Sequence, residues 1–121
     1  MSKTLLAAVE DLENIEKELV EVTLHSETID RRRLIKLRAS LLQGLMSLGQ
    51  TAKDDAEFSA DPERLKRFRH RHNEIKNHMS QHQANWMPST IREDPEEYNK
   101  AARNLGRANA EFFAWAKKVA T

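Results

Sequence analysis

Apolar side chains recur at alternating steps of three and four residues through the second half of this 121-residue chain. That step matches the turn of an α-helix, about 3.6 residues, and returns each side chain to the same face. The first stripe consists of Leu65, Phe68, His72, Ile75, Met79, His82 and Trp86. The second stripe consists of Tyr98, Ala101, Leu105, Ala108, Phe112, Trp115 and Val119. The pattern predicts two long helices, each with one buried face.

Few residues in the chain favour tight turns. It contains only 3 Gly and 3 Pro, with 39% apolar and 32% charged residues. Sheets need frequent turns rich in such residues, so this composition favours an all-α fold. A chain of 121 residues suits one hydrophobic core. We therefore expect a single domain over residues 1–121.

The first half of the chain carries the same helical spacing. Residues 3–24 predict a helix with Ser2 as its N-cap. Its buried seam would be Leu5, Ala8, Leu12, Ile15, Leu19 and Val22. A polar stretch follows, in which the second helix could be capped by Ser26, Thr28 or Asp30. The seam of that second helix would be Leu34, Leu37, Leu41, Gly44 and Leu48.

The end of the second helix is expected near Gly49, since glycine commonly follows the last helical residue. Gly44 lies inside the helix and predicts close packing of a neighbour, because glycine is otherwise unfavourable there. Residues 50–60 are polar and weakly patterned, and predict a loop. Phe58 would attach that loop to the core.

Each of the last two helices has a strong start signal. Both begin with Asp-Pro-Glu, at residues 61–63 and 94–96. The Asp can cap the helix, the Pro has a helical φ, and the Glu suits the positive end of the helix dipole. The two segments share no repeat consensus beyond these caps, so we reject a repeat protein. Antiparallel packing would place Phe112 and Trp115 against Phe68.

The expected architecture is an up-and-down bundle of four helices. Long helices joined by short connections pack as antiparallel neighbours. A bundle of three long helices, with no break after the first, is the alternative. No stretch of the chain is apolar enough to cross a membrane or to act as a secretory signal, and the chain has no Cys. A cytoplasmic location follows as the expectation.

Four of the five histidines fall between residues 70 and 82. Glu74, His78 and His82, four residues apart, could project toward one metal ion. His72 and His82, with Met79 between them, could hold a haem. However, no Glu-x-x-His motif occurs in the chain, and a histidine on an apolar seam is more often hydrogen-bonded to a neighbouring helix. We therefore expect no cofactor.

Motifs for catalysis are absent from the sequence. No serine lies in a nucleophile elbow, and no glycine-rich loop could hold a phosphate. We expect the protein not to be an enzyme.

Two basic runs open the second and third helices. Their arginines include Arg31, Arg32, Arg33, Arg64, Arg67 and Arg71. They could contact the phosphates of a nucleic acid. Pairing with the acidic first helix is the preferred interpretation, since the net charge is only +1 and no aromatic stacking platform accompanies the arginines.

Apolar residues also occur beside the predicted seams. They are Leu6, Val20, Leu24, Ile35, Leu42, Met46 and Phe113. Some must complete the core, and any that stay exposed would form a surface for a partner helix or a second copy of the chain. We select Leu6, Val20, Ile35, Leu42 and Met46 as candidate partner-binding residues.

The N-terminal half also contains a Leu-Glu-Leu pattern, followed by a basic residue and paired leucines. The residues are Leu12, Glu18, Leu19, Arg38, Leu41, Leu42 and Leu45. On this pattern the segment resembles the flagellar export chaperones of the FlgN and FliT type. The resemblance implies a small cytoplasmic helical bundle that holds a helix of a flagellar subunit before secretion.

Three functions follow as hypotheses. The favoured one is a non-enzymatic interaction module, such as an adapter, an export chaperone or a small regulator. The alternatives are a nucleic-acid-associated protein and a histidine-based metal or haem protein.

Overall fold

The structure, a computed structural model, describes residues 3–24, 31–87 and 95–121. These residues form five helices: α1 (Lys3–Leu24), α2 (Arg31–Asp54), α3 (Ala56–Ser59), α4 (Pro62–Asn85) and α5 (Pro95–Ala120). No strand occurs in these three ranges, and the predicted all-α class is confirmed. The number of helices is one more than predicted, because the short α3 lies where a loop was expected.

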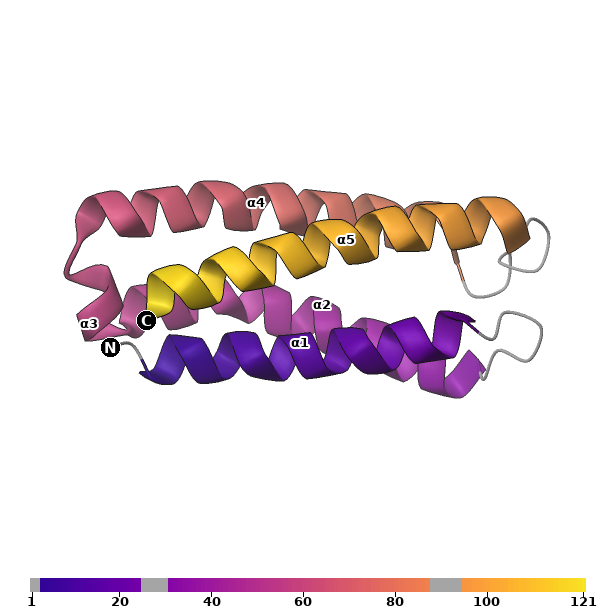
Figure 1. Cartoon of the computed structure of the whole chain (residues 1–121), viewed down its shortest axis with the longest axis horizontal. Coiled ribbons are helices and arrows are strands. Elements are labelled where there is room, and N and C mark those ends of the chain that lie inside the picture. The colour runs from indigo at the N-terminus through magenta and orange to yellow at the C-terminus, as the bar shows by residue number, and fades with distance from the viewer. Residues whose placement is uncertain (1–2, 25–30, 88–94) are drawn as a thin grey trace.

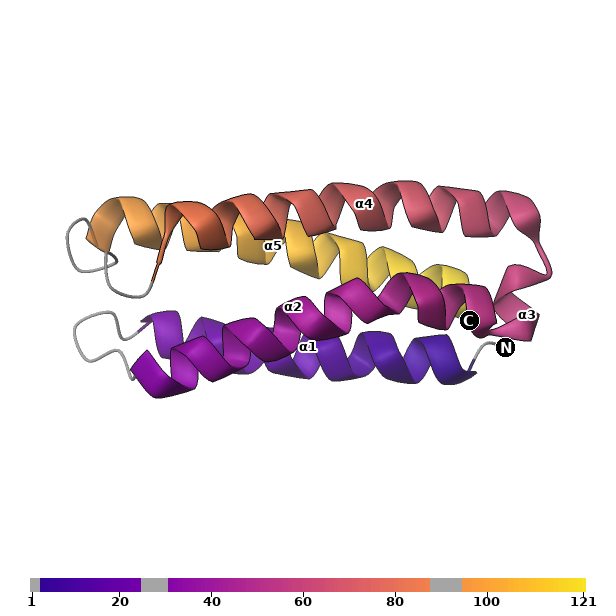
Figure 2. The same ribbon diagram turned by 180° about the vertical axis from the view of Figure 1, so that it is seen from behind.

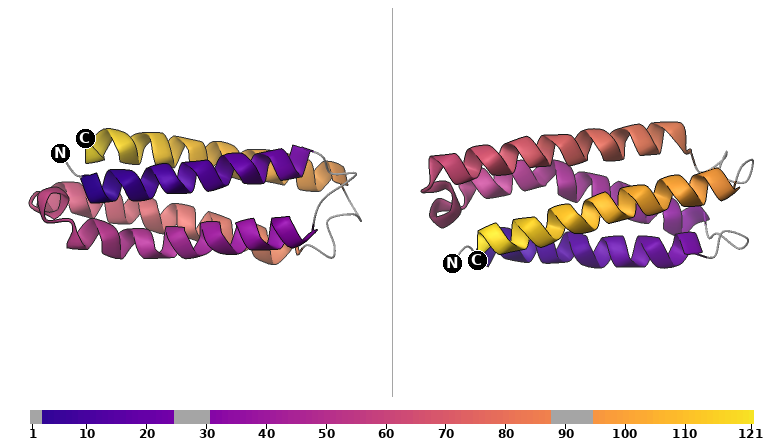
Figure 3. Two further views of the ribbon diagram at one scale, coloured as in Figure 1. Left: turned by 90° about the horizontal axis from the view of Figure 1, so that it is seen from below. Right: turned by 45° about the horizontal axis from the view of Figure 1, so that its top comes forward.

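The four long helices lie side by side and alternate in direction (Figures 1 and 2). α1 contacts α2 and α5, and α4 contacts the same two helices, so the four close a ring around the core (Figure 3). The short α3 contacts α2 and α4 at one end of the molecule. Since α1 and α2 are separate helices that pack against each other, the alternative of three long helices is wrong.

The start of α4 follows the predicted capping signal. The Asp61 side chain accepts hydrogen bonds from the backbone N–H groups of Glu63, at 3.1 Å, and Arg64, at 3.2 Å. Pro62 occupies the first turn, where a backbone N–H has no helical partner in any case. The other proposed caps lie outside the described residues: Ser2, Ser26, Thr28, Asp30 and Asp94.

The predictions that the second helix ends near Gly49 and that residues 50–60 form a loop are wrong. Gly49 does not have the positive φ of a helix-ending glycine. Ala52 is fully buried, and the Gln50 amide donates to the Asp54 carboxylate at 2.8 Å, so one more turn is stabilised on both faces. Phe58 is fully buried, as expected for a residue that attaches this segment to the core.

Asp55 links the starts of two helices. One of its carboxylate oxygens accepts a hydrogen bond from the Phe58 N–H of α3 at 3.0 Å. The other accepts from the Leu5 N–H in the first turn of α1 at 3.2 Å. Helix N-termini leave such N–H groups without intrahelical partners. A single buried carboxylate therefore holds α1 and α3 together.

The core next to α3 is aromatic. Phe68 of α4 lies 5.9 Å from Phe112 and 6.1 Å from Trp115 of α5, measured between ring centroids. Toward the other end of the same pair, Tyr98 lies 5.6 Å from Trp86. These contacts confirm the predicted antiparallel packing of the last two helices.

The buried face of α1 differs from the predicted seam. Val9 and Glu16 are buried, whereas Ala8 and Ile15 are only partly buried. The face is therefore rotated toward α5, where Glu16 meets Asn109. On the α2 side the prediction for Gly44 is confirmed, because a Cβ at this position would overlap the Leu12 side chain.

None of the described helices combines the length and the apolarity needed to cross a lipid bilayer.

Candidate partner-binding surface

The outward side of α2 carries a second apolar seam. Ile35 and Met46 are 52% and 54% exposed, although both are large and apolar. Ala39 is exposed and Leu42 partly buried between them. The steps of four, three and four residues place all four side chains on one face of the helix. We call this set, Ile35, Ala39, Leu42 and Met46, the outer seam.

The outer seam lies on the side of α2 nearest α4. Gly49, seven residues after Leu42, faces His72 of α4, whose ring lies 3.1 Å from the position of a Cβ at residue 49. Leu42 also packs against core residues at its inner edge. The seam is thus continuous with the core on one side and exposed on the other.

The other two predicted partner-binding residues lie elsewhere. Val20 is 41% exposed and lines a groove of about 610 Å³ with residues of α5 such as Glu97 and Arg103. Leu6 is partly buried against the core. Both residues lie on the flank of α1 that faces α5, the flank from which Glu13 pairs with Lys117 at 2.9 Å. The structure therefore divides the predicted surface between two edges of the bundle.

Two further apolar residues, one buried and one exposed, bear on the candidate surface. Phe113 is almost fully buried and belongs to the core. Met87, which follows α4, is 56% exposed. The side chain of Leu24 lies outside the described residues.

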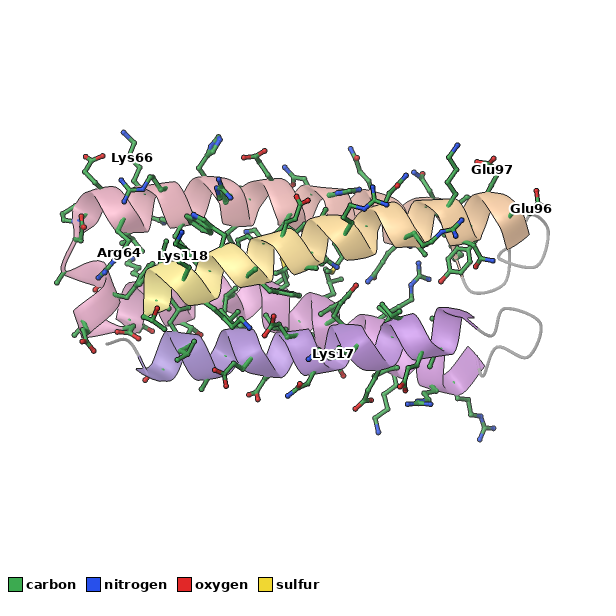
Figure 4. All side chains as sticks on the ribbon, viewed as in Figure 1. Lys17, Arg64, Lys66, Glu96, Glu97 and Lys118 are labelled. Carbon is green, nitrogen blue, oxygen red and sulfur yellow. The ribbon has the colours of Figure 1, made fainter. Side chains whose placement is uncertain are left out.

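The two basic runs lie at opposite ends of the molecule. α2 has 24 residues, so its start and the start of α4 are separated by about 36 Å of helix. Figure 4 shows Arg64 and Lys66 at the start of α4, at the same end of the molecule as Lys118 and at the opposite end from Glu96. The runs therefore do not form one continuous patch.

Several of these arginines have partners inside the fold. The Arg64 guanidinium donates to the Phe58 carbonyl and lies 4.6 Å from the centroid of that ring. The Arg71 guanidinium lies 4.5 Å from the centroid of the Trp115 ring. Arg33 approaches Glu18 of α1 at 4.0 Å, which fits the expected pairing with the acidic helix.

Of the other candidate arginines, Arg32 and Arg67 are exposed. The side chain of Arg31 lies outside the described residues.

The predicted metal ligands do not converge. Glu74 and His78 line an open groove between α4 and α5 together with Glu111. The Glu74 carboxylate lies 3.1 Å from Nε2 of His70. His82 instead lines an interior cavity on another side of α4. Side chains four residues apart on a helix are rotated by about 40° relative to each other, which explains why Glu74, His78 and His82 point in different directions. Within residues 3–24, 31–87 and 95–121, no group of three His, Asp or Glu side chains is arranged to hold a metal ion.

The seam histidine His72 is buried and its Nε2 bonds to the Leu45 carbonyl of α2. Its ring stacks against both Phe68 and Phe112, at centroid distances of 5.9 and 6.3 Å. Burial lowers the pKa of His72, with the Leu45 bond acting in the opposite direction. The geometry agrees with the expectation of a seam histidine bonded to a neighbouring helix.

A buried polar group connects the helices near the middle of the bundle. Asn109 of α5 donates from Nδ2 to Glu16 of α1 at 3.1 Å. Burial raises the pKa of Glu16 to about 7, although the bond from Asn109 lowers it. Arg38 of α2 is buried nearby, and burial lowers its pKa. None of these three residues is predicted to be interior from the sequence, because charged and amide side chains do not mark a buried face.

Comparison with protein-family models, with curated proteins and with solved structures finds no significant match to the chain.

Proposed function

We propose that this protein is a non-enzymatic interaction module whose outer seam binds an amphipathic helix of a partner protein. The observation that carries the proposal is the exposure of Ile35 and Met46, both above one half, on the same face of α2. Large apolar side chains of this kind, aligned on one helix, are typical of a surface that a partner covers.

The spacing of the outer seam favours a helical partner. Positions separated by four, three and four residues are those that interlock between two packed helices. α2 already uses one such seam for the core, through Leu34, Leu41 and Leu48. A second seam on the same helix supplies the contacts that a further helix would need.

The charges around the outer seam favour a partner with acidic flanks. Within α2 only Asp54, at its end, is acidic, and the Gln50 amide already bonds it. Arg32 and Lys53 continue the line of the seam at its two ends, and both are exposed. Glu or Asp residues beside the apolar face of the partner would be attracted to this edge.

A chaperone that holds a helix of a flagellar subunit is the specific form of this proposal that the family resemblance suggests. The residues that carry the resemblance are mostly internal: Leu12, Arg38, Leu41 and Leu45 are buried. They describe how α1 and α2 pack. Leu42 is the member that reaches the outer seam. A cytoplasmic location belongs to the same proposal.

The test uses two synthetic helical peptides with the same apolar heptad seam, one flanked by Glu and the other by Lys. We expect the Glu peptide to bind about tenfold more tightly or better, as measured by fluorescence anisotropy. The double substitution Ile35→Ser, Met46→Ser should abolish binding without loss of helicity, because both side chains are exposed. Val20→Ser, at the α1–α5 groove, is the matched control and should bind normally.

Binding of the Glu peptide to the double variant as tight as to the wild type would overturn the proposal. So would sedimentation that shows a dimer of the wild-type chain, dissociated by the same two substitutions, since a second copy would then cover the seam. Neither the basic runs nor the histidines supply a comparable continuous surface, so we do not carry the other two hypotheses further.

A further inference from the structure

A small cavity lies inside the ring of long helices. It has a volume of about 30 Å³, and all four long helices contribute to its wall. The polar side chains in that wall are Glu16 from α1, Arg38 from α2, His82 and Gln83 from α4, and Tyr98 from α5. The rest of the wall is mostly apolar, with Leu41, Met79 and Leu105 among its residues.

Arg38 is buried in this wall without a counter-charge. The residue is 6% exposed, and its Nη2 has no hydrogen-bond partner in the part of the chain that the structure describes. No described carboxylate forms an ion pair with it. Burying a charged group without a partner is strongly unfavourable, and native structures rarely leave such a group uncompensated. The guanidinium therefore requires a negative group that the described side chains do not provide.

Several other side chains in the wall are hydrogen-bond donors. Its charge acts on the ionisation of Tyr98 and His82, which places both within electrostatic reach of the guanidinium. Burial, then the charges of Arg38 and His78, lower the pKa of His82 to about 4, so the ring is neutral and donates one N–H. Gln83 donates to the Arg38 carbonyl at 3.3 Å and retains a second amide N–H.

Glu16 does not neutralise the guanidinium. Its carboxyl group is bonded to Asn109 at 3.1 Å and forms no ion pair with Arg38, and burial raises its pKa to about 7, so it is only partly ionised near neutral pH. The wall thus combines one permanent cation with neutral donors and a partly ionised acid.

We propose that the cavity binds a small monovalent anion of chloride size, held by the Arg38 guanidinium together with the Tyr98 hydroxyl and the His82 ring. A water molecule needs roughly 10–15 Å³ on this measure, so the cavity has room for about one halide ion or two waters. It is too small for sulfate, phosphate or a carboxylic acid. Water could accept a hydrogen bond from Nη2, but it would leave the charge of Arg38 uncompensated.

The first experiment measures urea unfolding of the full chain in sodium chloride and in sodium gluconate at equal ionic strength. Gluconate is too large to enter the cavity and controls for screening. We expect chloride to raise the unfolding midpoint. Above its dissociation constant, each tenfold increase in chloride should add the same increment of stability, as for any ligand of the folded state.

The substitution Arg38→Met removes the charge and keeps much of the volume, so it should lose most of the chloride effect. Arg32→Met, on the exposed face of the same helix, is the matched control and should keep it. Wild-type protein also permits a test that depends on no variant. In crystals grown in sodium bromide, anomalous scattering should show a bromide ion within hydrogen-bond distance of Arg38.

An unfolding midpoint that is the same in chloride and gluconate, with no bromide peak in the cavity, would mean that the cavity holds water only. Chloride stabilisation that persists in Arg38→Met would place the ion elsewhere on the protein. Either result overturns the proposal.

Discussion

Asn109 and Glu16 join α5 to α1 by a hydrogen bond of 3.1 Å inside the apolar core. Asn109 is fully buried, and its own Oδ1 has no partner among the described residues. The bond satisfies the Nδ2 donor of Asn109 but leaves its Oδ1 acceptor without a donor among the described residues. A protonated or amide group at residue 16 can supply that donor, whereas a carboxylate cannot.

The ionisation of Glu16 should therefore destabilise the fold as the pH rises. The pKa is about 7 in the folded chain and 4.5 ordinarily, so the folded state binds more protons between these values. The stabilisation is complete below about pH 4.5 and is lost as the pH rises through 7. Glu16→Gln should become more stable than the wild type across this window, by at most about 3 kcal/mol.

Urea unfolding at a series of pH values measures this difference. Glu10→Gln, an exposed change on the same helix, is the control. A stability difference between Glu16→Gln and wild type that does not vary with pH would contradict the prediction.

The ionisation of His82 should give the opposite pH dependence, with stability lost as the pH falls. Its pKa falls to about 4 in the folded chain, below the ordinary 6.5, so the unfolded chain binds more protons between these values. The stability contributed by neutral His82 is present above about pH 6.5 and is lost as the pH falls through 4. His82→Gln should therefore lose less stability than wild type on acidification. His70→Gln, at an exposed position, should behave like wild type.

Gly44 and Gly106 form a matched pair of helical glycines. At Gly44 a Cβ would overlap Leu12, whereas at Gly106 it would meet Glu16 Oε1 at 3.4 Å, an ordinary contact. Gly44→Ala should destabilise the fold by about 1 to 3 kcal/mol through overpacking. Gly106→Ala should be neutral or stabilising by up to about 1 kcal/mol, since alanine favours helix. Thermal unfolding of both variants measures the two changes in stability. A stabilised Gly44→Ala variant would contradict the prediction and show that the Leu12 side chain can move aside.

Replacing Asp55 should affect two helices at once. Asp55→Ala removes the acceptor for the N–H groups of Phe58 and Leu5, and a lost cap costs typically about 1 kcal/mol. We expect a loss nearer 2 kcal/mol, against about 1 kcal/mol for Asp61→Ala, which caps α4 alone. Amide proton chemical shifts at Leu5 should change in Asp55→Ala and stay unchanged in Asp61→Ala. Equal effects of the two variants would contradict the double role.

The sequence predicts the long helices well because their apolar spacing is regular and Asp61 provides a strong start signal. It predicts the rotation of each helix less well. The spacing of apolar residues places Trp115 on the seam, yet Trp115 is only partly buried beneath Arg71, and the interior position belongs to Ala116. Hydrophobicity does not reveal that a small residue lies inside and a large one at the edge.

The apolar spacing also leaves open which residues of the candidate surface lie together. Ile35 and Met46 are exposed on one face of α2, whereas Leu6 and Val20, which the sequence groups with them, lie on α1. One-dimensional spacing indicates that a residue is off the seam without indicating which neighbouring helix its flank faces. That assignment depends on the order of helices around the ring, which the sequence pattern does not contain.

The bond between Leu5 and Asp55 also bears on how the chain folds. It spans 50 residues, so the first turn of α1 receives this cap only after α1 and α2 have paired and α3 has formed. Contacts between distant parts of a chain form after the intervening loop has closed. The bond is thus a late event, and breaking it should accelerate unfolding while leaving the refolding rate nearly unchanged. The start of α1 would then be among the last parts of this bundle to reach its final state.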